Sequence, residues 1–77
     1  MAAKRRDWKA KTKGLLKAEL ARQNLGYAGL AAKLAAIGVK DNEQNVKNKI
    51  NRGTFSAIFF VQCLEAIGAS TLRLEDS

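Results

Sequence analysis

The sequence predicts an all-helical domain of four helices, and three observations support this fold class. Apolar residues recur at helical spacing along most of the chain, which is typical of amphipathic helices. Helix-favouring Ala, Leu and Lys are abundant, and the 77 residues include no proline. Glycines follow the expected helical segments, where a left-handed residue can end a helix. A chain of this length forms one domain with a modest core.

The N-terminal part of the sequence predicts one arm and one helix. Leu16 and Leu20 lie one helical turn apart, which favours an amphipathic helix over residues 10–24. Gly14 lowers the helix propensity of this segment, so we expect the regular helix to begin near it. The chain is therefore divided into a basic N-terminal arm and a helical domain, over residues 1–12 and 13–77 respectively.

Two short helices are expected in the middle of the chain. The second predicted helix covers residues 27–37 and ends at Gly38, beyond which Val39 can fold back onto Leu34. The third covers about residues 42–52, with Asp41 or Asn42 as its N-cap; Asp41 also fits a capping box. Two short helices joined by so few residues are typical of a helix-turn-helix unit.

The last part of the sequence predicts a very apolar helix and a short strand. Ser56 is a good N-cap for a helix that runs to about Ile67. Phe55 can pack onto Phe60 at its start, and the face expected to point inward consists of Phe60, Leu64 and Ile67. Residues 71–74 alternate between polar and apolar, as a strand does.

The fourth predicted helix has more apolar side chains than one face can bury. A small domain rarely exposes such a surface without a partner. We therefore expect a homodimer, with the tail pairing across the two-fold axis; the alternative is a monomer whose tail covers the apolar surface. The residues assigned to the dimer interface are Ile58, Phe59, Val61, Leu72 and Leu74.

Positive charge is concentrated in the first two thirds of the chain. Residues 1–52 carry 13 Lys or Arg against 4 Asp or Glu, whereas residues 53–77 carry 1 against 3. A basic front of this kind attracts polyanions such as nucleic acids. The charge therefore favours a nucleic acid as a partner, and the helix-turn-helix unit narrows this to double-stranded DNA. Plain solubility is an alternative explanation for the charge.

The third predicted helix carries the candidate binding site. Val46 and Ile50 centre its buried face, so Asn48 points directly away at about 100° per residue. Amide side chains match the paired donor and acceptor of adenine, and arginine matches guanine. We assign base-edge contacts to Gln44, Asn48 and Arg52, and phosphate contacts to Lys47, Lys49, Asn51, Thr54 and Tyr27. The alternative is a polar face that is merely solvated.

One pattern of apolar residues and glycines runs through residues 13–69, and it includes Leu16, Leu20, Tyr27-Ala28-Gly29-Leu30-Ala31, Leu34, Gly38-Val39, Val46, Ile50 and Arg52-Gly53. The pattern resembles the phage-repressor/Cro-like helix-turn-helix domains, which implies sequence-specific DNA binding, usually as a dimer. A further resemblance, to an uncharacterised bacterial family of small stand-alone domains of this type, rests on Leu15–Leu20, Asn48–Gly53 and Gln62–Gly68. The link before the third helix is longer here than in the repressor pattern, so the contacts above follow from helical geometry.

The composition argues against an enzyme, a metal site, a cofactor and a membrane segment. There is no histidine, and the seven acidic residues are spread along the chain. The single cysteine, Cys63, fits a reducing cytoplasm. No apolar stretch approaches the roughly 20 residues that cross a bilayer. We therefore expect a cytoplasmic, nucleoid-associated DNA-binding regulator without catalytic activity.

A second hypothesis uses the fourth predicted helix instead. Its apolar surface would bind a partner protein, as in an antitoxin or an assembly adaptor, and the positive charge would be incidental. RNA binding ranks lower, because Trp8 is the one aromatic residue placed outside the core for stacking on bases.

Overall fold

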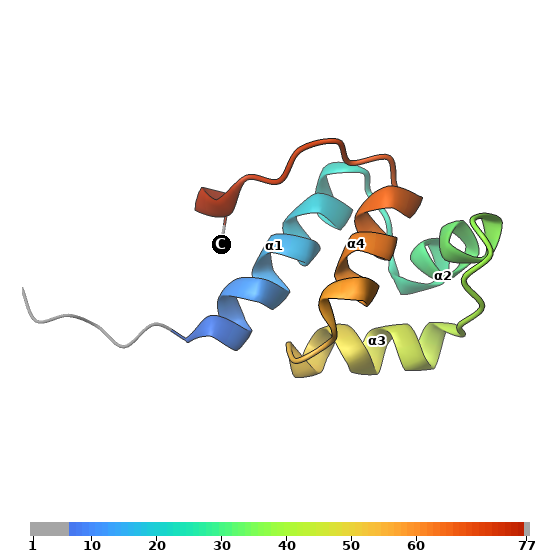
Figure 1. Ribbon diagram of the computed structural model, residues 1–77, viewed down its shortest axis with the longest axis horizontal. Helices are drawn as coiled ribbons and strands as arrows, with labels where there is room; N and C mark the ends of the chain where they lie inside the picture. Colours follow the sequence, from blue (N-terminus) through green and yellow to red (C-terminus); the bar gives the residue numbers. More distant parts are fainter. Residues whose placement is uncertain (1–6, 77) are drawn as a thin grey trace, which may run out of the picture.

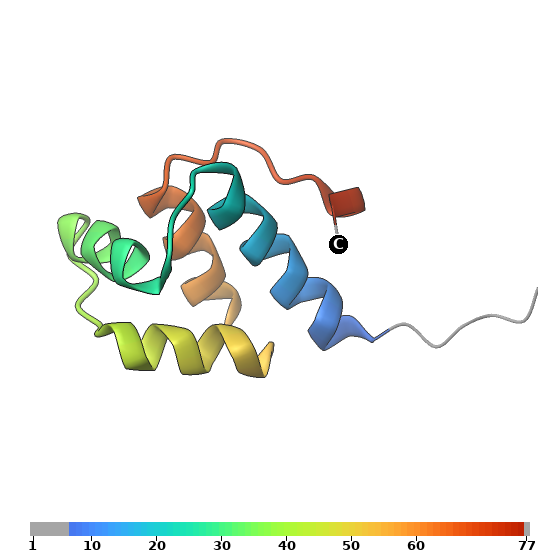
Figure 2. The same ribbon diagram turned by 180° about the vertical axis from the view of Figure 1, so that it is seen from behind.

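The computed structural model describes residues 7–76, and four helices and one short 3₁₀ helix lie in that range. They are α1 (Trp8–Arg22), α2 (Tyr27–Ala36), α3 (Glu43–Arg52), α4 (Ala57–Ala66) and η1 (Leu74–Asp76). In Figure 1, α1 and α4 lie side by side, α3 runs along one side of the molecule and α2 crosses at one end. The C-terminal segment returns along the side opposite α3, as Figures 1 and 2 both show. The predicted small all-helical fold is confirmed.

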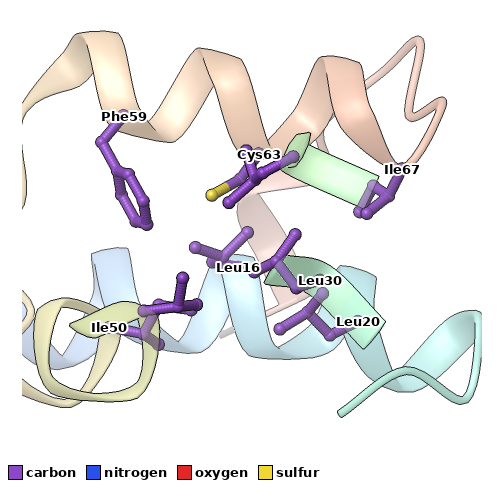
Figure 3. Close-up of a cluster of buried hydrophobic side chains, with 9 residues drawn as sticks. Leu16, Leu20, Leu30, Ile50, Phe59, Cys63 and Ile67 are labelled. Carbon is purple, nitrogen blue, oxygen red and sulfur yellow. The ribbon is translucent and has the colours of Figure 1, made fainter. Parts of the chain in front are cut away.

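All four helices contribute to a single core. Its centre consists of side chains with no exposed surface, and the close-up in Figure 3 shows α4 facing residues of the other helices. These fully buried residues are Leu16, Leu30, Leu34, Val46, Ile50 and Cys63. The periodic apolar residues of the first three helices therefore point inward, as their spacing predicts.

Three helices end in the same way. In each, the second residue beyond the C-cap donates its backbone N–H to the carbonyl of the residue five positions earlier, at 2.9 Å. This bond satisfies one of the carbonyls that have no partner within the helix. The bonds are Leu25 to Leu20, Val39 to Leu34 and Ala69 to Leu64. The predicted return of Val39 onto Leu34 is confirmed, and Gly38 takes the required positive φ of 87°. In α1 the left-handed position is Asn24, with φ 54°.

α1 begins earlier than Gly14. Asp7 caps it, because its Oδ1 accepts a hydrogen bond from the backbone N–H of Ala10 at 3.1 Å. Residues 8–12, which the sequence assigned to the basic arm, are therefore helical. The remainder of that arm, residues 1–6, lies outside the described residues.

The short C-terminal strand is not found, and that prediction is wrong for the tail that the structure describes. Residues 71–73 have no regular structure and lead into η1. A strand needs a neighbouring edge for its backbone groups. Here the Nζ of Lys11 on α1 donates to the carbonyl of Leu74, so a side chain satisfies that acceptor.

The buried face of α4 is only partly the predicted one, because Ile67 is buried as expected but Phe60 and Leu64 are not its companions. The buried residues are Phe59 and Cys63 on the helix and Ile67 at its C-cap, whereas Phe60 and Leu64 are only half-buried. The start of the helix is as expected: Ser56 Oγ accepts from the backbone N–H of Phe59 at 3.0 Å. The predicted contact of Phe55 with Phe60 is confirmed at 5.7 Å between ring centroids, and Phe55 also packs edge-on against Phe59 at 5.6 Å.

Candidate nucleic-acid interface

α3 has one narrow buried face and a wide polar face. Val46 and Ile50 are fully buried, and Lys49 beside them is half-buried. The seven other residues of the helix are exposed: Glu43, Gln44, Asn45, Lys47, Asn48, Asn51 and Arg52. α3 thus contributes two apolar side chains, one turn apart, to the core. Its remaining surface is composed of amides and charged groups.

The ends of α3 are defined by local chemistry. The side-chain oxygen of Asn42 accepts from the backbone N–H of Asn45 at 2.7 Å, so Asn42 is the N-cap. The capping box with Asp41 is therefore wrong. At the other end Gly53 adopts a φ of 71°, and its N–H donates to the carbonyl of Ile50 at 3.0 Å. α3 is held at both ends, which fixes the direction of its side chains.

The three residues predicted to reach base edges lie along one exposed line of α3. Gln44, Asn48 and Arg52 are spaced four residues apart, and all are exposed. The Nε2 of Gln44 donates to the Oδ1 of Asn48 at 3.3 Å, so the two amides lie side by side. Each amide retains donor and acceptor capacity beyond this bond. Arg52 has no hydrogen bond or ion pair within residues 7–76.

Lys49, a predicted phosphate contact, already has a partner within the protein, although its side chain is 39% exposed. Its Nζ lies 2.6 Å from the Oδ2 of Asp41 and 4.8 Å from the centroid of the Phe59 ring. The position next to Val46 on the helix turns the side chain toward the loop and α4. Lys49 therefore helps to hold α3 against the rest of the protein, a role that the sequence did not predict, and its assignment as a phosphate contact stays a prediction. Lys47 remains exposed.

The ion pair of Lys49 also explains what Asp41 does in place of capping. The ammonium of Lys49, through its hydrogen bond, holds the pKa of the Asp41 carboxyl below its usual value. The Asp41 side chain is 9% exposed, and its Oδ1 also accepts from the backbone N–H of Asn42 at 3.0 Å. This carboxylate joins the loop before α3 to the middle of the helix.

Three helices meet at the C-terminal end of α3. The hydroxyl of Tyr27, at the start of α2, donates to the Oδ1 of Asn51 at 3.4 Å. The Nζ of Lys13, on α1, donates to the backbone carbonyl of Asn51 at 3.3 Å. Thr54, just beyond the helix, is exposed. The structure thus brings together Tyr27 and Asn51, both predicted phosphate contacts, and places Lys13 of α1 beside them.

The residues predicted for a dimer interface do not share one surface. Ile58 and Val61 are 71% and 60% exposed. Together with Ala57 and Gln62 they line a shallow apolar hollow of ≈ 340 Å³. Phe59 is 6% exposed and belongs to the core, so its assignment to the interface is wrong. Leu72 is half-buried and Leu74 is exposed on the tail.

Metal-ligating side chains do not cluster in the described part of the chain. Residues 7–76 contain no group of three or more Cys, Asp or Glu side chains placed to hold a metal ion. Cys63 is buried, and desolvation raises the pKa of its thiol to about 12, so it stays protonated. In the same range, no helix has the length and apolarity needed to cross a membrane.

Comparison with known proteins places the chain in a family without assigning an activity. No curated protein and no solved structure matches the chain. Residues 8–72, which run from the start of α1 to the tail before η1, match the family described as "Domain of unknown function (DUF6471)". That description does not mention phage repressors, so the resemblance to them stays a prediction. The chain belongs to the DUF6471 family.

Proposed function

We propose that the protein binds double-stranded DNA with sequence preference and that α3 is its recognition helix. The observation that carries this proposal is the exposed polar face of α3, on which Gln44, Asn48 and Arg52 form one line. An α-helix fits the major groove of B-DNA, where each base pair presents a distinct pattern of donors and acceptors. α3 has the side chains to read such a pattern and needs little of its surface for the core.

The connection of α2 to α3 supports a helix-turn-helix unit. α2 ends at the Gly38 turn, six residues separate it from α3, and Leu30 and Leu34 pack in the same core as Val46 and Ile50. In Figures 1 and 2, α2 lies near the N-terminal end of α3 and at a large angle to it. In proteins with this unit, the second helix enters the major groove and the first crosses the backbone.

The residues of the proposed interface have two kinds of expected role. The amides of Gln44 and Asn48 can pair with adenine, and the guanidinium of Arg52 can pair with guanine. Lys47 supplies a phosphate contact, and so do Asn51, Tyr27 and Thr54 at the end of α3. The protein would act as a cytoplasmic, nucleoid-associated regulator without catalytic activity, as a homodimer whose subunits meet through Ile58 and Val61.

Binding measurements with matched variants test this function. A preferred sequence is first selected from a random duplex library, and affinities for it and for a random duplex are compared. Asn48→Ala or Arg52→Ala should lower discrimination between the two duplexes about 5- to 150-fold, since a bidentate base contact contributes about 1–3 kcal/mol. Lys47→Ala should weaken binding to both duplexes equally. The control is Arg73→Ala, which removes an exposed cation from the tail opposite α3.

The outcome that contradicts the proposal is clear. Equal losses on both duplexes for Asn48→Ala, Lys47→Ala and the Arg73→Ala control would leave only nonspecific attraction by charge.

A protein-interaction function is the second candidate, and the exposure of Ile58 and Val61 favours it. α4 has no cation and a single acidic residue, Glu65, so its outer surface is apolar and nearly uncharged. If a partner protein remains bound after Lys47→Glu but is lost with Ile58→Glu, this candidate replaces DNA binding. Ile58 is the suitable position, because Phe59 is buried and its substitution would disturb the fold.

A further inference from the structure

We propose that one edge of α1, formed by Lys9, Lys13 and Lys17, contacts the phosphates of duplex DNA beside the C-terminal end of α3. This inference rests on the proposed function and extends its interface to a helix outside the α2–α3 unit. The three residues are called the lysine edge below. They are spaced four residues apart and therefore follow one side of the helix over about 12 Å.

The first observation is how closely α1 approaches the end of α3. A Cβ atom added to Gly53 would lie 2.7 Å from the backbone oxygen of Lys9, which is shorter than real Cβ contacts. Gly53 itself is buried. The first turn of α1 therefore packs directly on the turn that ends α3. The exposed side chain of Lys9 begins within a few ångströms of the helix that carries Arg52.

The second observation is the hydrogen bond that links α1 to Asn51. Lys13 Nζ reaches the Asn51 carbonyl at 3.3 Å, and the Tyr27 hydroxyl reaches the side chain of the same residue at 3.4 Å. The ammonium of Lys13 is thus placed at the end of the proposed recognition helix. It uses one of its three donors there, and two remain for an anion.

Lys17 continues the same edge toward the start of α2. It lines a shallow pocket of ≈ 250 Å³ together with Gly26 and Tyr27, and its side chain is exposed. Neighbouring lysines of the edge are about 6 Å apart along the helix axis. Phosphates of one DNA strand repeat every 3.4 Å along the duplex axis. Lysine side chains are long and flexible enough to meet alternate phosphates at that spacing.

The other charged groups of α1 leave this edge positive. Asp7 accepts a hydrogen bond from the first turn of its own helix. Glu19 is buried and ion-paired with Arg22. Lys11 projects from the opposite side of α1, where its Nζ donates to the carbonyl of Leu74. α1 therefore has cations on two sides, and only one side adjoins α3.

This arrangement allows a test in which total charge is held constant. The double variant Lys9→Gln/Lys13→Gln removes two charges from the lysine edge. The double variant Lys11→Gln/Arg73→Gln removes two charges from the side away from α3. Affinity for the selected duplex and for a random duplex is measured by fluorescence anisotropy with the full chain between 50 and 200 mM salt. Over this range, a difference of about 2 in the slope of log affinity against log salt changes the loss of affinity roughly tenfold.

The lysine-edge variant should reduce the slope of log affinity against log salt by about 2, because each neutralised phosphate contributes about 0.9. The loss should be the same for both duplexes, since phosphates carry no sequence information. Lys9→Gln alone should reduce the slope by about 1, and this variant keeps the Lys13–Asn51 hydrogen bond intact. The Lys11→Gln/Arg73→Gln variant should leave the slope unchanged.

Two results would overturn the inference, and they can be told apart. If both double variants change the slope equally, the lysine edge has no special role, although Asn48→Ala can still relax the sequence preference and support the proposed function. If the wild-type chain shows no preference for any duplex and Asn48→Ala changes nothing, the proposed function fails and the inference fails with it.

Discussion

Helices α3 and α4 have the same length of ten residues, and each begins at a polar side chain that caps it. Each also buries a similar number of apolar side chains: Val46 and Ile50 in α3, and Phe59 and Cys63 in α4. Their outer surfaces differ completely. α3 presents amides and cations with one carboxylate, whereas α4 presents Ala, Ile and Val with one carboxylate.

This difference is consistent with the proposal that the two helices have separate surfaces for separate partners. Both are anchored in the same core, so neither outer surface is needed to complete it. The polar surface of α3 suits the edges and phosphates of a nucleic acid. The apolar surface of α4 suits another protein chain. Substitutions that separate buried from exposed positions on each helix therefore test the comparison.

The largest expected effect is on α4, at Phe59. Phe59→Ala should lower the free energy of unfolding by about 3–5 kcal/mol, because it removes a core aromatic ring and leaves a cavity. Ile58→Ala, one residue away, should change it by no more than about 0.5 kcal/mol, since Ile58 is 71% exposed. Urea denaturation followed by circular dichroism measures both. Similar losses for the two variants would show that α4 buries a different face.

The next effect is at the end of α3, where Gly53 can be compared with Gly38 at the end of α2. Both have positive φ, 71° and 87°, so alanine at either position should cost about 1–2 kcal/mol of backbone strain. Gly53→Ala should cost about 1–3 kcal/mol more, because the new Cβ would meet the backbone of Lys9, whereas nothing lies within 4 Å at Gly38. Equal costs in urea denaturation would contradict the close approach of α1 to α3.

A smaller effect concerns the ion pair that holds α3 to its preceding loop. The pKa of Asp41 is lowered in the folded state by Lys49, so its stabilisation is fully present above the usual value of 3.8. It is lost as pH falls through the lower folded pKa. Because Lys49 is 39% exposed, the pair should contribute about 1 kcal/mol or less. The measurement is the stability difference between wild type and Asp41→Asn from pH 6 to pH 2, which should shrink at the acid end; a constant difference would argue against the pair.

The smallest expected effect on stability is on the outer surface of α3. Asn48→Ala and Arg52→Ala should change the free energy of unfolding by no more than about 0.5 kcal/mol, since both side chains are exposed. The same variants should alter DNA preference, so the surface would be functional without being structural. A loss of several kcal/mol would instead mean that these residues support the fold.

The sequence predicts the buried face of α3 correctly and that of α4 only in part, for a physical reason. In α3, Val46 and Ile50 are the only apolar residues, so one face alone can turn inward. In α4, residues 57–61 are all apolar, and two sets at helical spacing compete for the core. Periodicity alone does not separate Phe60 and Leu64 from Phe59 and Cys63. Packing against the other helices decides between them.

Long-range contacts explain what else the sequence leaves open. The role of Lys49 depends on Asp41 and on the ring of Phe59, which lies on another helix. The meeting of Lys13 with Asn51 joins residues 38 positions apart, and local patterns do not encode such a pair. The glycine stops, in contrast, depend on adjacent residues, and Gly38 and Gly53 end their helices as predicted.

The most direct test of the central claim is an NMR titration of the full chain with the selected duplex. The side-chain NH₂ groups of Gln44, Asn45, Asn48 and Asn51 give resonances of their own and lie on the exposed side of α3. We expect these resonances and the backbone amides of α3 to shift on binding, while the amides of Ile58 and Val61 on α4 respond only to dimer formation. If the DNA-dependent shifts instead centre on the outer surface of α4 and leave the side chains of Asn48 and Gln44 unchanged, then α3 is not the DNA-binding helix.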